Sequence, residues 1–118
     1  MRELDASTFD GAIAANPIVV DFWAPWCKPC RAIETILDEL AQDAAWPVSF
    51  AKLNVDEHPE IASRYEVLSI PTVMLFAGGE PHGALVGARP RAHVERWLAE
   101  VLPAAELEGL AVQGQRDA

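Results

Sequence analysis

Residues 22–30 read FWAPWCKPC and contain both cysteines of the 118-residue chain, Cys27 and Cys30. Just before them, residues 18–23 (IVVDFW) are mostly β-branched or aromatic, which predicts a strand buried on both faces, as parallel strands are. Just after them, the apolar residues from position 33 to 40 recur at spacings of three and four, which predicts a helix ending near residue 43. The two cysteines are therefore expected where a strand gives way to a helix.

This position favours a reactive dithiol over a structural disulfide. A bridge between the two cysteines closes a four-residue loop, for which chain entropy gives only about 2 kcal/mol of stabilisation. At a helix N-terminus, unpaired backbone amides and the helix dipole stabilise a thiolate, and Cys27 has that position. Cys30 lies one turn further in and is expected to be more buried. The expected chemistry is attack by the Cys27 thiolate on a substrate disulfide, followed by resolution by Cys30.

Composition limits the organisation and the partners of the chain. Its length is that of one domain. A net charge of −9 argues against nucleic acid and anionic membranes as partners, because both are themselves negatively charged. The chain contains no run of about 18 apolar residues and begins with no signal-peptide pattern, so a cytoplasmic location is expected. The chain is also expected to be a monomer.

The remaining segments extend the α/β pattern. Helices are expected over residues 7–15, capped by Ser7, over 59–65, and from Pro90 to a stop at Pro103. Strands are expected over 48–55, 72–76 and 83–86, the last two joined by a turn at residues 78–79. A strand, a long helix and a strand in succession imply parallel pairing, whereas the final hairpin is antiparallel. The sequence predicts a mixed sheet of four to five strands with helices on both faces, in a domain over 1–102 followed by a flexible tail over 103–118.

Four segments together resemble the thioredoxin family, from about residue 4 to 102. They are VDFWAPWCKPC (20–30), KLNVDEHP (52–59), IPTVMLFAGGE (70–80) and LVGA (85–88), in the family's order and spacing. The resemblance implies a thioredoxin fold and a protein-disulfide reductase acting on disulfide-containing client proteins. It also implies that an NADPH-dependent thioredoxin reductase recharges the protein. The sequence contains no G-x-G-x-x-G motif, no Walker loop and no metal-ligand pattern, so no bound cofactor is expected.

The resemblance implies a role for individual residues as well. Cys27 would attack and Cys30 resolve, Asp21 would be the buried proton relay, and Lys52 would pair with Asp21. Trp23 would pack beneath the sulfurs. The substrate-binding positions would be Trp26, Lys28, Pro29, Ile70, Pro71 in the cis form, Val86, Gly87 and Ala88. Independently of the family, burial in an apolar strand is expected to raise the pKa of Asp21.

Lys28 and Thr35 are among the positions that depart from the family pattern. Lys28 replaces the usual glycine, and its charge should stabilise the neighbouring thiolate and make the pair slightly more oxidising. Thr35 replaces a proline that kinks the long helix, so a straighter helix is expected. Lys28 leaves open a specialised oxidant, isomerase or single-client reductant. A metal-binding or scaffold protein is the third alternative, although no second C-x-x-C or histidine pair supplies the other ligands of a zinc site.

Overall fold

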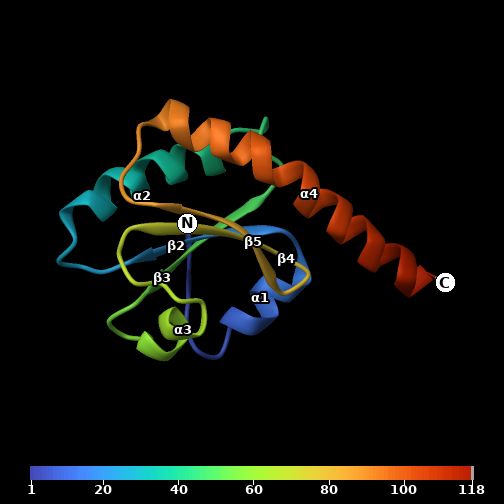
Figure 1. The fold of residues 1–118 in the computed structure, drawn as a ribbon, viewed down its shortest axis with the longest axis horizontal. Coiled ribbons are helices and arrows are strands. Elements are labelled where there is room, and N and C mark those ends of the chain that lie inside the picture. The colour runs from blue at the N-terminus through green and yellow to red at the C-terminus, as the bar shows by residue number, and fades with distance from the viewer. Residues whose placement is uncertain (118) are drawn as a thin grey trace.

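A five-stranded mixed sheet forms the centre of the computed structural model (Figure 1). The structure describes residues 1–117, with side chains described through residue 103 and at residue 105. The strands lie in the order β1 (Arg2–Leu4), β3 (Ser49–Asn54), β2 (Ile18–Trp23), β4 (Thr72–Ala77) and β5 (Glu80–Val86). β3 pairs in parallel with both β1 and β2, whereas β4 is antiparallel to β2 and to β5. The predicted mixed α/β sheet is confirmed.

Helices cover both faces of this sheet. Helices α2 (Lys28–Ala41) and α4 (Arg91–Asp117) lie on one face, and α1 (Phe9–Ala15) and α3 (Pro59–Arg64) on the other (Figure 1). Because side chains alternate along a strand, β2 contributes Val19 to the core beneath α2 and α4, and Val20 to the core beneath α1 and α3. Both residues are fully buried, so β2 is a central strand as predicted. Among the described residues, no helix combines the length and the apolar character needed to cross a membrane.

Strand β1 is an element that the sequence pattern did not reveal. Its three residues pair with Ala51, Lys52 and Leu53 of β3, and only Leu4 is buried. Three residues are too few to display the alternation by which a strand is recognised. The strand therefore depends on the edge that β3 offers it.

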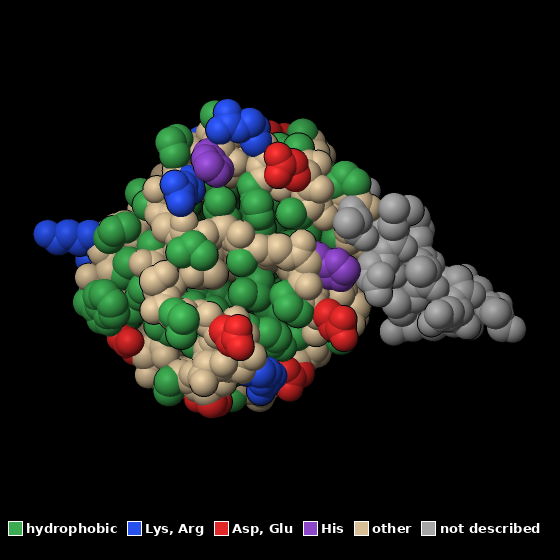
Figure 2. All heavy atoms as spheres, in the orientation of Figure 1, with side chains coloured by type: hydrophobic (Ala, Val, Ile, Leu, Met, Phe, Trp, Pro, Cys, Tyr) green, Lys and Arg blue, Asp and Glu red, His purple; other side chains and the backbone are tan. Residues whose placement is uncertain are grey.

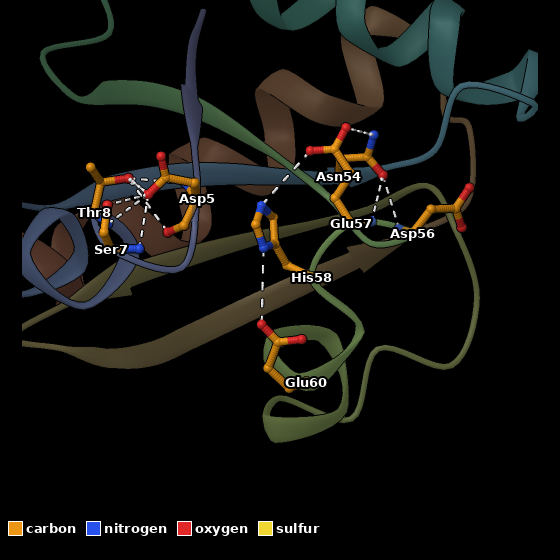
Figure 3. Close-up of polar contacts among 8 residues, drawn as sticks. All are labelled: Asp5, Ser7, Thr8, Asn54, Asp56, Glu57, His58 and Glu60. Carbon is orange, nitrogen blue, oxygen red and sulfur yellow. Dashed lines mark hydrogen bonds and ion pairs between the residues drawn. The ribbon is translucent and has the colours of Figure 1, made fainter.

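The predicted cap of the first helix is wrong. Thr8 is the N-cap residue of α1, and no side-chain hydrogen bond caps the helix there. Instead, Asp5 Oδ1 accepts hydrogen bonds from the backbone amides of Ser7 and Thr8 and from both of their hydroxyls (Figure 3). These hydrogen bonds favour the ionised carboxylate and so lower the pKa of Asp5. Ser7 donates to this turn and does not cap the helix.

The predicted stop at Pro103 is also wrong, because α4 continues through Asp117 with Pro103 inside it. A proline within a helix lacks the amide that would bond to the preceding turn, at a cost of about 3 kcal/mol. Burial on both sides offsets this cost, since Leu102 and Ala105 belong to the core beneath α2 and α4. The flexibility predicted for residues 103–118 concerns side chains that mostly lie outside the described part of the chain, and it stays a prediction.

Candidate active site

Cys27 and Cys30 lie at the start of α2 and are joined by a disulfide. Cys27 is the N-cap residue, with extended backbone, and its Sγ accepts a hydrogen bond from the backbone amide of Cys30 at 3.3 Å. Lys28 and Pro29 form the first helical positions and are exposed. Cys30 is 1% exposed and Cys27 4%, so Cys30 is the more buried cysteine, as predicted, although Cys27 is also nearly covered in the disulfide form.

A small apolar cluster surrounds the disulfide. Trp23, Val55 and Ile70 pack against the cluster that Ala24 and the two cysteines form. Trp23 thus lies against the cluster that contains the cysteines. Trp23 comes from the end of β2, Val55 follows β3, and Ile70 precedes β4, so the ends of three adjacent strands supply this environment. An apolar environment limits the access of water to the sulfurs.

Trp26 is the large exposed side chain beside Cys27, with 69% of its surface accessible. Its indole Nε1 donates a hydrogen bond to Asp56 Oδ2 at 2.9 Å. Asn54 holds Asp56 in turn. Its Oδ1 accepts hydrogen bonds from the backbone amides of Asp56 and Glu57 in the turn after β3 (Figure 3). The sequence did not predict this contact. An acidic residue within one of the four family-like segments was the available signal.

A shallow groove of about 370 Å³ lies between Trp26 and the segment before β4. Val55 and residues 67–70 form its other walls, and Leu68 is 95% exposed. Ile70 therefore contacts both the groove and the cysteine cluster. Of the other predicted substrate positions, Pro29, Val86 and Ala88 are exposed but do not line the groove.

Pro71 and Gly87 lie against each other at the edge of this site. The Ile70–Pro71 peptide bond is cis, as the sequence predicted from its family resemblance. The amide of Gly87 donates a hydrogen bond to the Pro71 carbonyl at 2.8 Å. Gly87 has a φ of +89°, a conformation that favours glycine, and this lets the chain after β5 turn toward Pro71. Two segments that the sequence assigned to one groove are thus joined directly.

Asp21 lies in the middle of β2 and is completely buried. Neither of its carboxylate oxygens has a hydrogen-bond partner within the described structure. Burial, together with the negative charges of Glu34 and Asp38, raises its pKa to about 7, and only the charge of Lys52 opposes this shift. The rise predicted from the sequence is confirmed, and the group can therefore gain or lose a proton near neutral pH.

The prediction that Asp21 forms an ion pair with Lys52 is wrong. Lys52 Nζ bonds instead to Glu34 Oε1 at 2.7 Å and lies 4.7 Å from the centre of the Trp23 ring. Glu34 comes from α2 and is partly exposed, so its charge costs less to maintain than that of the buried Asp21. Sequence reasoning missed Glu34, because nothing in its spacing shows that it faces β3.

Comparison with known proteins decides the family. The family model described as Thioredoxin matches residues 1–100. The chain belongs to the thioredoxin family. It is 47% identical over 100 residues to a thioredoxin of Alicyclobacillus acidocaldarius, covering 84% of this chain and 95% of the relative. A thioredoxin of Mycobacterium bovis is 43% identical over 104 residues, covering 87% and 90%. A bifunctional thioredoxin reductase/thioredoxin of Mycobacterium leprae is 44% identical over 100 residues, covering 84% of this chain and 22% of that protein.

Family and geometry together define the activity. The C-K-P-C pair of this thioredoxin lies at a helix N-terminus and forms a disulfide. The protein is a thiol-disulfide oxidoreductase that reduces protein disulfides. Across the side chains that the structure describes, no group of three or more histidine, cysteine, aspartate and glutamate residues could hold a metal ion.

Proposed function

We propose that this thioredoxin is a general reductant of protein disulfides, with Cys27 as nucleophile, Cys30 as resolving thiol and Asp21 as proton acceptor. The observation that carries the proposal is the burial of Asp21, which has no hydrogen-bond partner among the described residues and lies on the strand that leads into the disulfide loop. A group with a pKa of about 7 is suited to general acid–base catalysis at neutral pH.

The proposed reaction starts from the reduced dithiol. The Cys27 thiolate forms a bond to one client sulfur, and the client disulfide breaks with its other sulfur leaving as a thiolate. Cys30 then gives its proton to the Asp21 carboxylate and forms a bond to Cys27 Sγ, which breaks the mixed disulfide. Two electrons pass to the client, whose sulfurs leave as thiols after protonation by Asp21 or water. The Cys27–Cys30 disulfide in the structure is the product of this step.

The proposed client site is the groove beside Trp26. An extended client segment would pair with the exposed backbone at Ile70, beside Pro71, by strand addition. Trp26 and Leu68 would contact its apolar side chains, and the patch would continue over Pro29, Val86, Gly87 and Ala88. Exposed apolar groups without a deep pocket suit many clients bound weakly. Lys28, exposed beside the disulfide, would favour acidic client residues.

A thioredoxin reductase is the proposed source of electrons. The relative from Mycobacterium leprae is named as both thioredoxin reductase and thioredoxin, which supports direct transfer between the two kinds of domain. Reducing equivalents would come from NADPH, with no cofactor bound to this chain. A cytoplasmic location is proposed, because a reductant recharged by NADPH acts where thiols are kept reduced.

The proposed partners are proteins, not nucleic acids or membranes. The protein itself is proposed to be a monomer. On the face shown in Figure 2, acidic side chains lie among the basic ones. The net charge of −9 also works against attraction of a polyanion.

The equilibrium reduction potential of the Cys27–Cys30 pair tests this proposal against a specialised role. A value near the roughly −270 mV typical of thioredoxin would support a general reductant. A value above about −200 mV would instead indicate an oxidant or isomerase. The Cys30→Ser variant should trap mixed disulfides with clients through Cys27. Zinc content per chain, expected to be near zero, tests the metal-binding alternative.

A further inference from the structure

Lys52 is close enough to Asp21 along the sheet to pair with it. The parallel register of β2 and β3 places the two residues opposite each other. Asp21 shares a strand face with Val19, and Lys52 shares one with Phe50; both of these apolar residues belong to the core beneath α2 and α4. The two side chains therefore emerge from neighbouring strands on the same face of the sheet.

Two contacts and a partial exposure to solvent draw Lys52 away from this position. Its Nζ bonds to Glu34 Oε1, its charge lies over the Trp23 ring, and its side chain retains 19% exposure toward solvent. Burial lowers the pKa of Lys52, but the hydrogen bond and charge of Glu34, with the charges of Glu3 and Asp38, raise it overall. Lys52 is thus a stable cation whose hydrogen bond goes to α2.

We propose that Glu34 is a positioning residue, which holds the Lys52 ammonium on α2 and leaves the Asp21 carboxylate without a cationic partner. The effect of Glu34 on catalysis rests on the proposed role of Asp21, whereas its effect on the position of Lys52 does not. The consequence is that Asp21 holds its proton more tightly than it would beside a free lysine, so it exchanges that proton near neutral pH instead of remaining ionised.

The other groups facing Asp21 do not replace Glu34 in this role. From α2, Asp38 also repels a negative charge on Asp21, but its Oδ1 is paired with the α-amino group of Met1 at 2.9 Å. From β4, the residue opposite Asp21 is the apolar Val73. The core residues that α4 contributes to this face, Trp97 and Leu98 among them, carry no charge. Glu34 is therefore the group that decides where the Lys52 charge lies.

The test is the titration of the Asp21 carboxyl carbon by NMR in the oxidised protein. Glu34→Ala should lower the pKa of Asp21 by about one unit or more, because it removes a repulsive charge and frees Lys52 to approach. Glu39→Ala is the matched control: Glu39 lies on the same helix and is also ion-paired, with Arg91 at 2.6 Å, but it does not contact Lys52. An equal fall in both variants, or no fall in Glu34→Ala, overturns the inference.

A second background separates positioning from simple repulsion. In Lys52→Met, Glu34→Ala should lower the pKa of Asp21 by clearly less than it does when Lys52 is present. An equal fall with and without Lys52 means that Glu34 acts by its own charge alone, and it overturns the positioning role.

The pH dependence of the resolving step distinguishes failure of this inference from failure of the proposed function. Cys30 releases a bound peptide from Cys27 at a rate that depends on pH. The midpoint pH of this rate profile should shift with the pKa of Asp21. If Glu34→Ala moves the pKa but not this midpoint, the positioning role stands and the catalytic role of Asp21 is wrong. If the pKa does not move, the positioning role is wrong whatever the rate does.

Discussion

The indole of Trp26 donates a hydrogen bond to the carboxylate of Asp56 at 2.9 Å, although the two residues are 30 positions apart in sequence. This bond joins the loop before Cys27 to the turn after β3, which Asn54 shapes through its side-chain carbonyl. A tryptophan that is largely exposed is thereby held in one orientation at the wall of the groove. Preorganisation of this kind reduces the entropy that client binding must overcome.

Asp56→Ala should therefore weaken client binding with little effect on stability. We expect KM for a protein disulfide to rise about two- to five-fold at unchanged kcat, which corresponds to roughly 0.5–1 kcal/mol for one hydrogen bond. Exchange of the Trp26 indole N–H should become faster by NMR. Glu60→Ala, which removes an exposed carboxylate from the neighbouring helix α3, should leave both quantities unchanged. Equal effects of the two substitutions would show that the bond itself does not matter.

The sequence predicted those helices and strands whose apolar residues form a long run or recur at regular spacing. The apolar run of β2 and the spacings of three and four in α2 each describe burial over several residues, so their type and place follow from local chemistry. β1 was missed because its three residues owe their structure to the edge of β3. Pro103 was misread because local propensity stops a helix there, whereas burial of Leu102 and Ala105 continues it.

The residues of the active site also include some that the sequence could place and some that it could not. Cys27 and Cys30 could be placed because their chemistry depends on spacing and on the strand-to-helix junction. The partner of Lys52 could not, because the choice between Asp21 and Glu34 depends on how α2 is rotated over the sheet. That rotation is set by tertiary packing of Ile33, Leu37 and Leu40, and spacing alone does not give it.

Asp21 should make the stability of the oxidised protein depend on pH. Its pKa is raised from 3.8 to about 7 on folding, so between these values the folded state holds a proton that the unfolded state has lost. The free energy of unfolding should therefore fall as pH rises from about 4 to 7 and then level off, by up to roughly 4 kcal/mol in all. Denaturant titrations at pH 4 and pH 8 measure this difference.

Asp21→Asn provides the comparison, because an amide of the same shape carries no charge at either pH. The fall in stability between pH 4 and pH 8 should be smaller in this variant, and the variant should be more stable than the wild type at pH 8. Identical pH profiles for the two proteins would show that Asp21 ionises freely in the fold.

Lys28 should tune the potential of the pair. Lys28 is exposed at the first position of α2, where its charge lies next to Cys27 and stabilises the thiolate of the reduced form. Lys28→Gln should therefore make the pair more reducing by roughly 15 mV, the equivalent of about 0.7 kcal/mol in a two-electron couple. Alkylation of Cys27 at pH 6 should become slower, because less thiolate is present.

Lys28→Arg is the control for this effect, since it keeps the charge and should leave both the potential and the alkylation rate near their original values. If Lys28→Gln leaves the potential where it was, the charge is irrelevant to the redox balance, and the departure from the family's glycine is surface variation.

Gly83 fixes the distance between β5 and α4. Its φ is +148°, and a Cβ built there would lie 2.9 Å from Val101 Cγ1 of α4, closer than carbon atoms normally approach. Gly83→Ala should therefore force the helix to move and should lower the free energy of unfolding by about 1–3 kcal/mol. Denaturant unfolding at constant pH measures the loss.

Gly11→Ala is the matched substitution with the opposite expected sign. Gly11 lies within α1, and a Cβ there would meet nothing within 4 Å. The change should raise the free energy of unfolding by up to about 1 kcal/mol, because alanine restricts the unfolded chain and favours helix. If both variants shift stability in the same direction, the approach of α4 to β5 is not the cause. If they diverge, the positive φ and the close approach of Val101 together explain why residue 83 lacks a side chain.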